Sequence, residues 1–578
     1  MFLCFVSCLL VALASAKCYE SNPAHPPPIY GLKDAGLLDA FASIDHVLDG
    51  IIAAEKYDGA SFSVAVTSSK EMLWSRHHTA RVRNESRPDI PVVNGDALYR
   101  IASITKTFTT LGVLYQHAAG NLSLDDTIDK YVPELQGEQD GSIPWKDITL
   151  RTLASQLSGI PREFAQGDVF NLFRRMPYEP WEIGLPPLSN DAKDALPKCD
   201  EYGDNYEPKC LKKAKDPVFA PNQKSTYSNV AFELLGLAIS KVTGLSYEDY
   251  IGEAIFKPLG MSKSTLSRPP DSAGVIPLEP QYWDVDEGVQ NPTGGIYSST
   301  EDLSRYLRYI LTHYNGITHA ANWANPVSPA EGIYSFYGMP WEIFHTDKIL
   351  RDSRRMVRFV TKSGGLPGYF TIIMFLPEYD LGITILTAGS EPYLLHKLLE
   401  AVTVPIVRAA EELAIQQLNQ HYVGSFSSED EGLNSSLRLQ ADHRGLVMTE
   451  FISNSTDLFK SPFWDIVGAP QDRDWYLQGV PTMLYSDEKN KKGEKWRFNI
   501  AEYRNSQNTA IWDDFCITNL DTALYANLPL NELVFWADDD GVIEAIELTG
   551  FRSKLIRLHR DEKQGSTYQD GEQETLEL

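Results

Sequence analysis

The sequence predicts an α+β domain followed by an all-β domain. Up to about residue 420, segments with helical spacing of apolar residues are mixed with strand-like runs. Three of these runs, at residues 356–360, 370–376 and 381–386, follow one another with only turn residues between them. Beyond residues 422–426 the pattern changes to short alternating runs separated by Asp, Asn and Gly, which is typical of an all-β module.

The elements of the first domain can be taken in chain order. Residues 61–67 alternate like a strand, and residues 72–74 have the pattern of its hairpin partner. The expected helices are residues 37–56, 103–120, 148–157, 230–242 and 391–419. The last of these is expected to kink or break at Pro405, because proline removes a backbone donor and clashes with the preceding turn.

These patterns predict a chain of several segments. They are a signal peptide at residues 1–16, a first domain at 17–420 with a loop-rich insertion at 163–222, a β-rich domain at 421–560, and an acidic tail at 561–578 that is expected to be disordered. A chain of 578 residues is too long for one ordinary domain, and its 43% of hydrophobic residues can fill a large core.

The net charge narrows the class of partner. The formal charge is −26 at pH 7, which argues against nucleic acid or an anionic membrane surface. It favours a soluble particle whose copies repel one another.

The first residues predict export. Residues 2–16 form a short apolar run that ends in Ala14-Ser15-Ala16, a small-x-small cleavage pattern, so a signal cut after Ala16 is expected. The best later candidate for a membrane span, residues 372–386, is interrupted by Pro377-Glu-Tyr-Asp380. We therefore expect a secreted protein that is not embedded in a membrane.

The cysteines and the glycosylation sequons fit a secreted protein. Removal of the signal leaves Cys18, Cys199, Cys210 and Cys516, an even number that allows three pairings. The closeness of Cys199 to Cys210 in sequence favours that bridge and leaves Cys18 with Cys516. Glycosylation acceptors are expected at Asn84, Asn121, Asn434 and Asn454.

The insertion has two interpretations. It is either a lid over a functional site or a surface excursion held by its cysteine pair. Its aromatic residues Trp181, Tyr202 and Tyr206 favour the lid.

A Ser-x-x-Lys pattern is the first candidate for chemistry. Ser103 and Lys106 open the helix at residues 103–120, and residues three apart share a helix face. A lysine in a low-dielectric pocket can draw off the serine proton, and the helix N-terminus favours the charge that develops. Taken alone, the pattern also fits a polar helix cap followed by a solvated lysine.

Two further motifs strengthen the first. Tyr227-Ser228-Asn229 directly precedes a helix, and Lys362-Ser363-Gly364-Gly365 ends a strand. They add a Tyr/Asn pair, a second lysine and a small-residue strand whose backbone can approach a carbonyl closely. Each has a structural alternative, a helix cap for the first and a tight hairpin for the second.

In this order, the three motifs resemble the serine β-lactamase and penicillin-binding-protein superfamily. The similarity is to class C β-lactamases and the related esterases and DD-peptidases, over roughly residues 37–412. A looser resemblance is to long secreted fungal members with a C-terminal β-rich module. The family fold has an antiparallel sheet flanked by a helical region. The sequence departs from the family at Ser363, where threonine is usual, and in the insertion.

The resemblance also implies roles. Ser103 is expected to be acylated, while Lys106 and Tyr227 share its proton and Lys362 helps to stabilise the phenolate. Asn229 is expected to hold the Lys106 side chain and to face the substrate carbonyl. The backbone N–H groups of Ser103 and Gly365 would form the oxyanion hole. No cofactor or metal is implied.

Three functions remain open at this point. The leading hypothesis is a secreted serine hydrolase acting on an ester or amide, so the expected partner is a small-molecule ester, amide or acyl substrate. An acyltransferase that passes the acyl group to a metabolite would use the same residues. The third is a non-catalytic binding protein that retains the fold.

Overall fold

The structure is a computed structural model. It describes residues 19–31, 33–137, 142–163, 180–194, 216–279, 282–314, 323–430, 432–467, 474–503, 515–516, 520 and 523–558. The chain divides into two compact units. One unit is Ile29–Glu411, and the other combines Met1–Pro28 with Glu412–Leu578.

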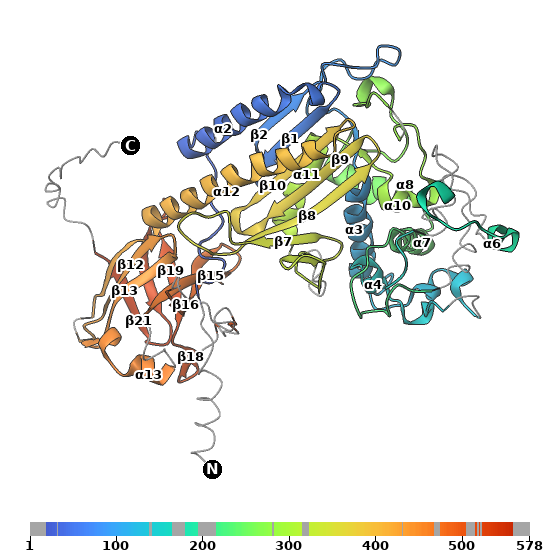
Figure 1. Cartoon of the computed structure of the whole chain (residues 1–578). Helices are drawn as coiled ribbons and strands as arrows, with labels where there is room; N and C mark the ends of the chain where they lie inside the picture. Colours follow the sequence, from blue (N-terminus) through green and yellow to red (C-terminus); the bar gives the residue numbers. More distant parts are fainter. Residues whose placement is uncertain are drawn as a thin grey trace. The chain divides into compact units, whose positions relative to one another are not determined.

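The first unit is built on an eight-stranded sheet in the order β2-β1-β10-β9-β8-β7-β6-β5, with every neighbouring pair antiparallel (Figure 1). Its strands are β1 (Ser61–Thr67), β2 (Met72–His78), β5 (Ser328–Pro329), β6 (Ser335–Tyr337), β7 (Glu342–Thr346), β8 (Val357–Leu366), β9 (Tyr369–Leu376) and β10 (Leu381–Ala388). A short pair, β3 (Tyr99–Arg100) with β4 (Tyr297–Ser298), stands apart from it.

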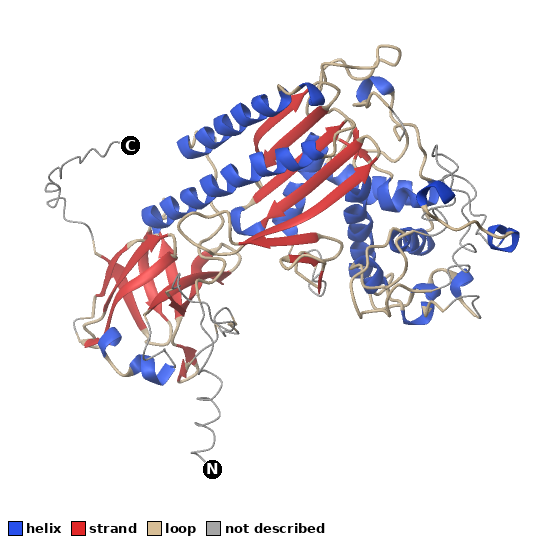
Figure 2. Cartoon of the chain, in the orientation of Figure 1, coloured by secondary structure: helices blue, strands red, loops and turns tan. Residues whose placement is uncertain are grey.

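Alternating residues of the central strands serve two cores. On β9, Ile373 and Phe375 pack into one hydrophobic cluster, whereas Ile372 and Met374 pack into the other. This is the two-residue period of a strand that is buried on both faces. The sheet is therefore a middle layer covered on either side, as Figure 2 shows.

Helices form both covers. Buried residues of α2 and α12 belong to the cluster on one face of the sheet, and those of α3, α7 and α11 belong to the cluster on the other. The described helices of the chain are α2 (Ala35–Ile52), α3 (Thr105–Ala118), α4 (Leu150–Ala154), α6 (Asn190–Asp194), α7 (Val230–Thr243), α8 (Tyr247–Ile251), α9 (Lys257–Leu259), α10 (Asn291–Gly294), α11 (Thr300–His313), α12 (Tyr393–His421) and, in the second unit, α13 (Phe463–Val467).

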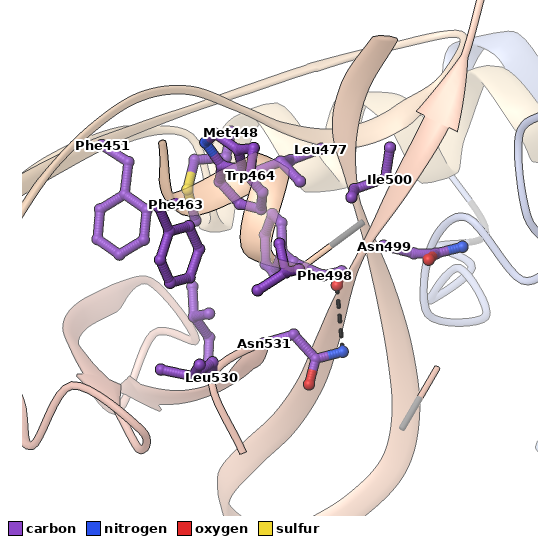
Figure 3. Close-up of a pocket in the computed structure, with 12 residues that line it drawn as sticks. Met448, Phe451, Phe463, Trp464, Leu477, Phe498, Asn499, Ile500, Leu530 and Asn531 are labelled. Atoms are coloured by element: carbon purple, nitrogen blue, oxygen red, sulfur yellow. Dashed lines mark hydrogen bonds between the residues drawn. The ribbon is translucent and has the colours of Figure 1, made fainter. Parts of the chain in front are cut away.

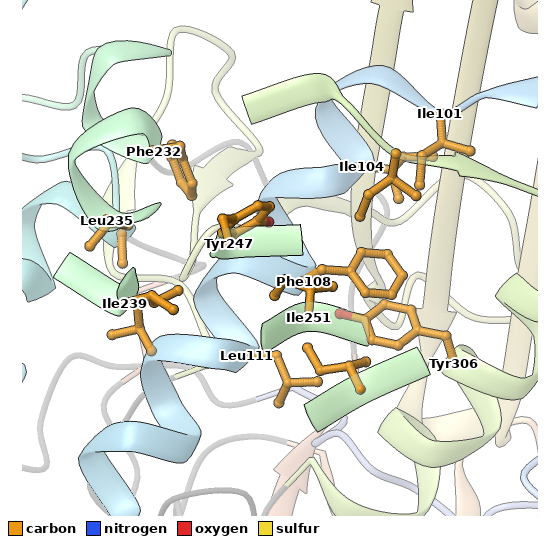
Figure 4. Close-up of a cluster of buried hydrophobic side chains, with 14 of the residues drawn as sticks. Ile101, Ile104, Phe108, Leu111, Phe232, Leu235, Ile239, Tyr247, Ile251 and Tyr306 are labelled. Carbon is orange, nitrogen blue, oxygen red and sulfur yellow. The ribbon is translucent and has the colours of Figure 1, made fainter. Parts of the chain in front are cut away.

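The core around α3 is tightly packed (Figure 4). Phe108 of α3 stacks on Tyr306 of α11, with ring centroids 4.1 Å apart and ring planes 18° apart. Gly112 lies where α3 meets neighbouring helices, because an added Cβ would lie 3.0 Å from the Tyr250 ring and 3.3 Å from Ile239 Cδ1. The helix that follows Ser103 is therefore fixed along its length.

The second unit is a closed antiparallel barrel. Each strand pairs with its successor, and the first pairs with the last, in the cycle β11-β12-β13-β15-β16-β19-β20-β21. Its strands are β11 (Gly424–Ser428), β12 (Ser436–Asp442), β13 (Gly445–Ser453), β15 (Trp475–Asp487), β16 (Lys492–Glu502), β19 (Glu532–Ala537), β20 (Ile543–Leu548) and β21 (Ser553–Arg557). The short strands β14 (Thr456–Asp457), β17 (Leu524–Tyr525) and β18 (Leu528–Pro529) lie outside the cycle. The predicted α+β domain followed by an all-β domain is confirmed.

Two details differ from the sequence-based expectations. Helix α12 runs through Pro405 without the break that was one of the two expected outcomes. The neighbouring Val402 and Ile406 are fully buried, and their packing holds the helix together across the missing hydrogen bond. In addition, the described residues 19–28 belong to the unit that contains the barrel, because Ser21 and Gln478 exchange hydrogen bonds of 2.6 and 3.2 Å.

The two ends of the insertion are tied together. Backbone hydrogen bonds run from Val218 to Gly159 (2.7 Å), from Asn222 to Leu157 (2.8 Å) and from Thr226 to Gln156 (2.8 Å). Gly159 is required here, since its φ is +72° and an added Cβ would lie 1.9 Å from the Phe219 carbonyl oxygen. We call this ladder the neck.

No single helix in the described ranges has the length and apolar character to cross a membrane. One bent pair, Val230–Thr243 with Tyr247–Leu259, meets the criteria by length and composition only.

Candidate active site

Ser103 lies in the turn that leads into α3. A 3-10 turn at Ala102–Ile104 connects the short strand β3 to the helix. Ala102 has a φ of +49°, an unusual backbone conformation for a residue with a Cβ. Such strain is found at positions that the surrounding structure holds firmly. Here Thr371 of β9 donates a 3.0 Å hydrogen bond to the Ile101 carbonyl.

Lys106 faces Ser103 from the first turn of α3. Its side chain is fully buried, and Nζ donates to Ser103 Oγ (3.0 Å) and to the Thr293 carbonyl (3.0 Å). Burial lowers the pKa of Lys106, and the nearby Lys362 charge lowers it further, against the opposing effect of Tyr227. A lysine in this position can exchange protons instead of remaining a fixed cation.

Tyr227 completes the contact with the serine. Its hydroxyl donates to Ser103 Oγ across 2.8 Å. Both of its neighbours are bound to the same buried glutamine, because the Thr226 N–H donates to the Gln156 carbonyl (2.8 Å) and the Ser228 N–H donates to Gln156 Oε1 (2.7 Å). Gln156 thus fixes the backbone on either side of the phenol.

Opposing effects set the pKa of Tyr227. Burial raises it, but the positive charges of Lys106 and Lys362 outweigh burial and hold the pKa below that of a free tyrosine. The two ammonium groups lie 5.1 and 5.3 Å from the centre of its ring. The site therefore favours the phenolate more than water does.

Lys362 is held in its charged form by Glu342. Its Nζ donates to Glu342 Oε1 at 2.5 Å, and the lysine side chain is 1% exposed. Burial lowers the pKa of Lys362, but the Glu342 carboxylate and Tyr227 raise it by more. The same pairing, with help from Ser363, lowers the pKa of Glu342 despite its burial.

The two glycines after Ser363 are in different surroundings. An added Cβ at Gly364 would lie 2.3 Å from the Ile101 carbonyl oxygen and 2.5 Å from Thr371 Oγ1, so β8 presses against the turn that carries Ser103. At Gly365 nothing lies within 4 Å of an added Cβ. The assignment of the Gly365 N–H to an oxyanion hole remains a prediction.

Asn229 differs from its expected role of holding Lys106. Its Nδ2 donates to Glu163 Oε1, and its backbone carbonyl accepts from Thr293 Oγ1 at 3.1 Å. Lys106 instead donates to the Thr293 carbonyl. The Asn229 side chain points to Glu163 because that acceptor follows directly after Pro161-Arg162, whose Arg162 carbonyl accepts from the Asn229 N–H.

Sequence reasoning did not find four residues that shape the site. They are Gln156, Glu163, Thr293 and Glu342. None of these four belongs to a motif that announces chemistry, and Thr293 acts through its backbone carbonyl. Only the strand register, in which Glu342 pairs with Thr361, brings that carboxylate next to Lys362.

The structure describes some of the remaining predicted residues and not others. Cys516 is disulfide-bonded, whereas Cys18, Cys199 and Cys210 lie outside the described residues, as do Tyr202 and Tyr206, so both pairings stay predictions. Trp181 is 63% exposed. The predicted glycosylation acceptors Asn121, Asn434 and Asn454 are exposed, and Asn84 is partly buried.

A hollow in the barrel unit has a different character from the Ser103 site (Figure 3). Apolar and aromatic side chains dominate its lining. They include Met448, Phe451, Phe463, Trp464, Leu477 and Phe498. Its polar residues are Asn499 and Asn531, and Asn531 donates to the Phe498 carbonyl at 3.2 Å. Among the described residues of this lining there is no serine, cysteine or lysine.

Comparison with known proteins agrees with the geometry. The family model described as Beta-lactamase matches residues 44–401. The chain belongs to the β-lactamase family. A second model, described as Beta-lactamase-like-like, C-terminal domain, matches residues 414–559, which contain the barrel. The predicted resemblance is thereby confirmed, and the first unit has the β-lactamase/transpeptidase fold.

Two relatives match this chain over nearly its whole length. A protein named "Probable hydrolase M10" from Phoma sp. is 29% identical over 569 residues, covering 95% of this chain and 93% of its own length. "Beta-lactamase-like protein" from Arthroderma benhamiae is 27% identical and covers 96% of this chain and all of its own length. A solved class C β-lactamase is 18% identical, with a TM-score of 0.47, and covers 65% of this chain and 97% of its own.

Proposed function

We propose that this protein is a serine hydrolase that cleaves an ester or amide through an acyl-enzyme on Ser103. One observation carries the proposal: Ser103 Oγ accepts hydrogen bonds from both the buried Lys106 ammonium and the Tyr227 hydroxyl, at 3.0 and 2.8 Å. The names of the fungal relatives, which include probable hydrolases, support the same general class of activity.

In the acylation step, Ser103 Oγ attacks the substrate carbonyl carbon while its proton passes to the Tyr227 phenolate. The carbonyl oxygen becomes an oxyanion that accepts hydrogen bonds from the N–H groups of Ser103 and Gly365. The bond to the leaving group then breaks, and Tyr227 returns the proton to that group. This leaves the acyl group esterified to Ser103.

Deacylation repeats the sequence with water. Tyr227 takes a proton from a water molecule, and the resulting hydroxide attacks the acyl carbonyl. Ser103 Oγ leaves and recovers the proton from Tyr227. Lys106 and Lys362 stabilise the phenolate at both stages.

Labelling by mass tests this proposal. Purified protein is incubated with a fluorophosphonate and with a panel of small esters, amides and β-lactams, and its intact mass is measured. We expect a single covalent adduct on Ser103 and none on Ser103→Ala. An adduct elsewhere, or more than a few per cent of wild-type turnover in Ser103→Ala, would exclude the covalent mechanism.

We also propose that the protein is exported. The support is the apolar run that ends at Ala16 and the bonded state of Cys516, since disulfides persist in oxidising compartments. N-terminal sequencing of protein recovered from the culture medium should begin at Lys17. Retention of the chain inside the cell with Met1 in place would refute export.

A further inference from the structure

A carboxylate already occupies the cationic side of the active site. Glu342 begins β7, and its side chain reaches the neighbouring strand β8. Oε1 accepts from Lys362 Nζ at 2.5 Å, while Oε2 accepts from the Ser363 N–H at 2.9 Å and from the Ser363 hydroxyl at 2.7 Å. One carboxylate therefore takes three donors.

Those three donors lie beside the reacting serine. Lys362 Nζ is 5.3 Å from the centre of the Tyr227 ring, and the Tyr227 hydroxyl touches Ser103 Oγ. An ammonium, a backbone N–H and a hydroxyl that converge on one point are the donor types that bind a carboxylate ligand. In this protein, the carboxylate of Glu342 occupies that point.

We propose that Glu342 determines substrate specificity by filling this anion-binding position, so that the site accepts neutral acyl groups and discriminates against acyl groups that carry a carboxylate. The proposal rests on the hydrolase function proposed above. An anionic substrate would have to displace Glu342 from Lys362 and Ser363 or be held next to its charge. A neutral aliphatic or aromatic ester requires neither.

Other charged groups also face Tyr227 and must be weighed. Lys106 donates to Ser103 and Thr293, and its pKa is lowered by burial. The Arg162 guanidinium lies 4.7 Å from the centre of the Tyr227 ring, but its Nε is 3.8 Å from Glu163 Oε1 and its side chain is 66% exposed. Water screens this exposed cation, whereas Lys362 is 1% exposed. Lys362 is therefore the cation whose availability Glu342 controls.

Two esters of matched length test the proposal. p-Nitrophenyl butyrate is neutral, and the mono-p-nitrophenyl ester of succinic acid places a carboxylate at the end of the acyl chain. The uncatalysed rate of each ester, which for the succinate ester includes attack by its own carboxylate, is subtracted, and the ratio of the two kcat/KM values at one pH is then compared between the variants. For the wild type we expect the neutral ester to be favoured at least about 10-fold.

Glu342→Gln should largely abolish this selectivity. The amide keeps the size of the side chain but leaves the Lys362 charge uncompensated, so the ratio should move toward the succinate ester by about 10-fold or more, mainly through KM. Any change in Tyr227 affects both esters equally and cancels in the ratio. Glu342→Asp retains the charge, and its preference for the neutral ester should stay within about threefold of wild type.

The matched control is Glu378→Gln. Glu378 also pairs with a cation on β8, Arg358, at 2.9 Å, four residues along the strand from Lys362. This substitution should leave the selectivity ratio unchanged. A change as large as that of Glu342→Gln would assign the effect to general disturbance of the sheet and overturn the proposal.

The outcomes separate the two proposals. If the wild type prefers the succinate ester, or if Glu342→Gln hydrolyses both esters with an unaltered ratio, the role of Glu342 is refuted and the hydrolase function stands. If neither ester nor the fluorophosphonate modifies Ser103, the hydrolase function itself fails. If Glu342→Gln does not fold, the wild-type ratio and Glu342→Asp still decide the matter.

Discussion

The hydroxyl of Tyr227 lies 2.8 Å from Ser103 Oγ, and the same oxygen accepts the Lys106 ammonium at 3.0 Å. The serine proton therefore has two possible acceptors. Because the phenolate of Tyr227 is favoured by two lysines while the pKa of Lys106 is lowered by burial, a single proton can be shared between the two side chains.

Tyr227→Phe should separate their roles. The phenyl ring keeps the packing but removes the oxygen that receives the serine proton, so acylation should slow by at least about 100-fold, as is typical for loss of a positioned base. Stopped-flow mixing with a p-nitrophenyl ester measures this step as a burst of p-nitrophenol. A burst rate equal to that of wild type would transfer the base role to Lys106.

The pH dependence should follow Tyr227. The mechanism needs its ionised form, so kcat/KM should rise with pH as the phenol loses its proton and fall as the pH drops through its lowered pKa. Lys362→Gln removes a charge that lowers this pKa, and it leaves the Glu342 charge, which raises it, uncompensated. The acidic limb of the profile should therefore move to higher pH.

The control for this profile is Arg358→Gln. It removes a cation from β8, the strand that carries Lys362, at a position four residues before Lys362. Its acidic limb should coincide with that of wild type. An acidic limb that stays in place in Lys362→Gln as well would show that the phenol does not govern the rate.

The adjacent glycines provide a paired steric test. Gly364→Ala should lower activity strongly and destabilise the first unit, because the new methyl would collide with the backbone oxygen of Ile101 at 2.3 Å. Gly365→Ala has open space and should fold like wild type. Circular dichroism melts and ester hydrolysis measure the two effects. Equal melting temperatures and activities of the two variants would show that the turn before Ser103 shifts to accommodate the new methyl group.

A buried ion pair offers a test of stability. Arg355 pairs with Glu411, which also accepts the Tyr379 hydroxyl at 2.9 Å. Glu411→Ala leaves a buried guanidinium without this partner and should lower the free energy of unfolding of the first unit by about 3–5 kcal/mol. The exposed pair of Asp49 and Arg76 provides the comparison, since Asp49→Ala should cost about 1 kcal/mol or less.

Unfolding in urea is monitored through hydrogen exchange of the backbone amides of β9 and β10. This probe reports on the first unit separately from the barrel. Similar losses in the two alanine variants would mean that the Arg355 side chain finds other partners after the substitution.

The sequence predicted the elements that depend on local pattern. Residues 61–67 alternate and form β1, and residues 230–242 have helical spacing and lie within α7. The serine and its lysine are three residues apart in sequence, so their contact across one helical turn could be inferred.

Features that depend on distant parts of the chain could not be predicted. Closure of the barrel depends on pairing between β11 and β21, whose residues are far apart in sequence. Glu342 reaches Lys362 only through the register of two strands, and Gln156 binds the residues beside Tyr227 across a stretch of about 70 positions. No local periodicity encodes such contacts.

The neck has a consequence for how this site can change in evolution. Its hydrogen bonds close the chain at Gln156–Gly159 and Val218–Thr226, immediately before Tyr227, so the catalytic phenol takes its position from the base of the insertion and not from its length. Loop-closure entropy grows slowly, by roughly 0.6 kcal/mol for each doubling of length. The insertion can thus be lengthened, shortened or replaced to suit a new substrate while Ser103, Lys106 and Tyr227 keep their positions.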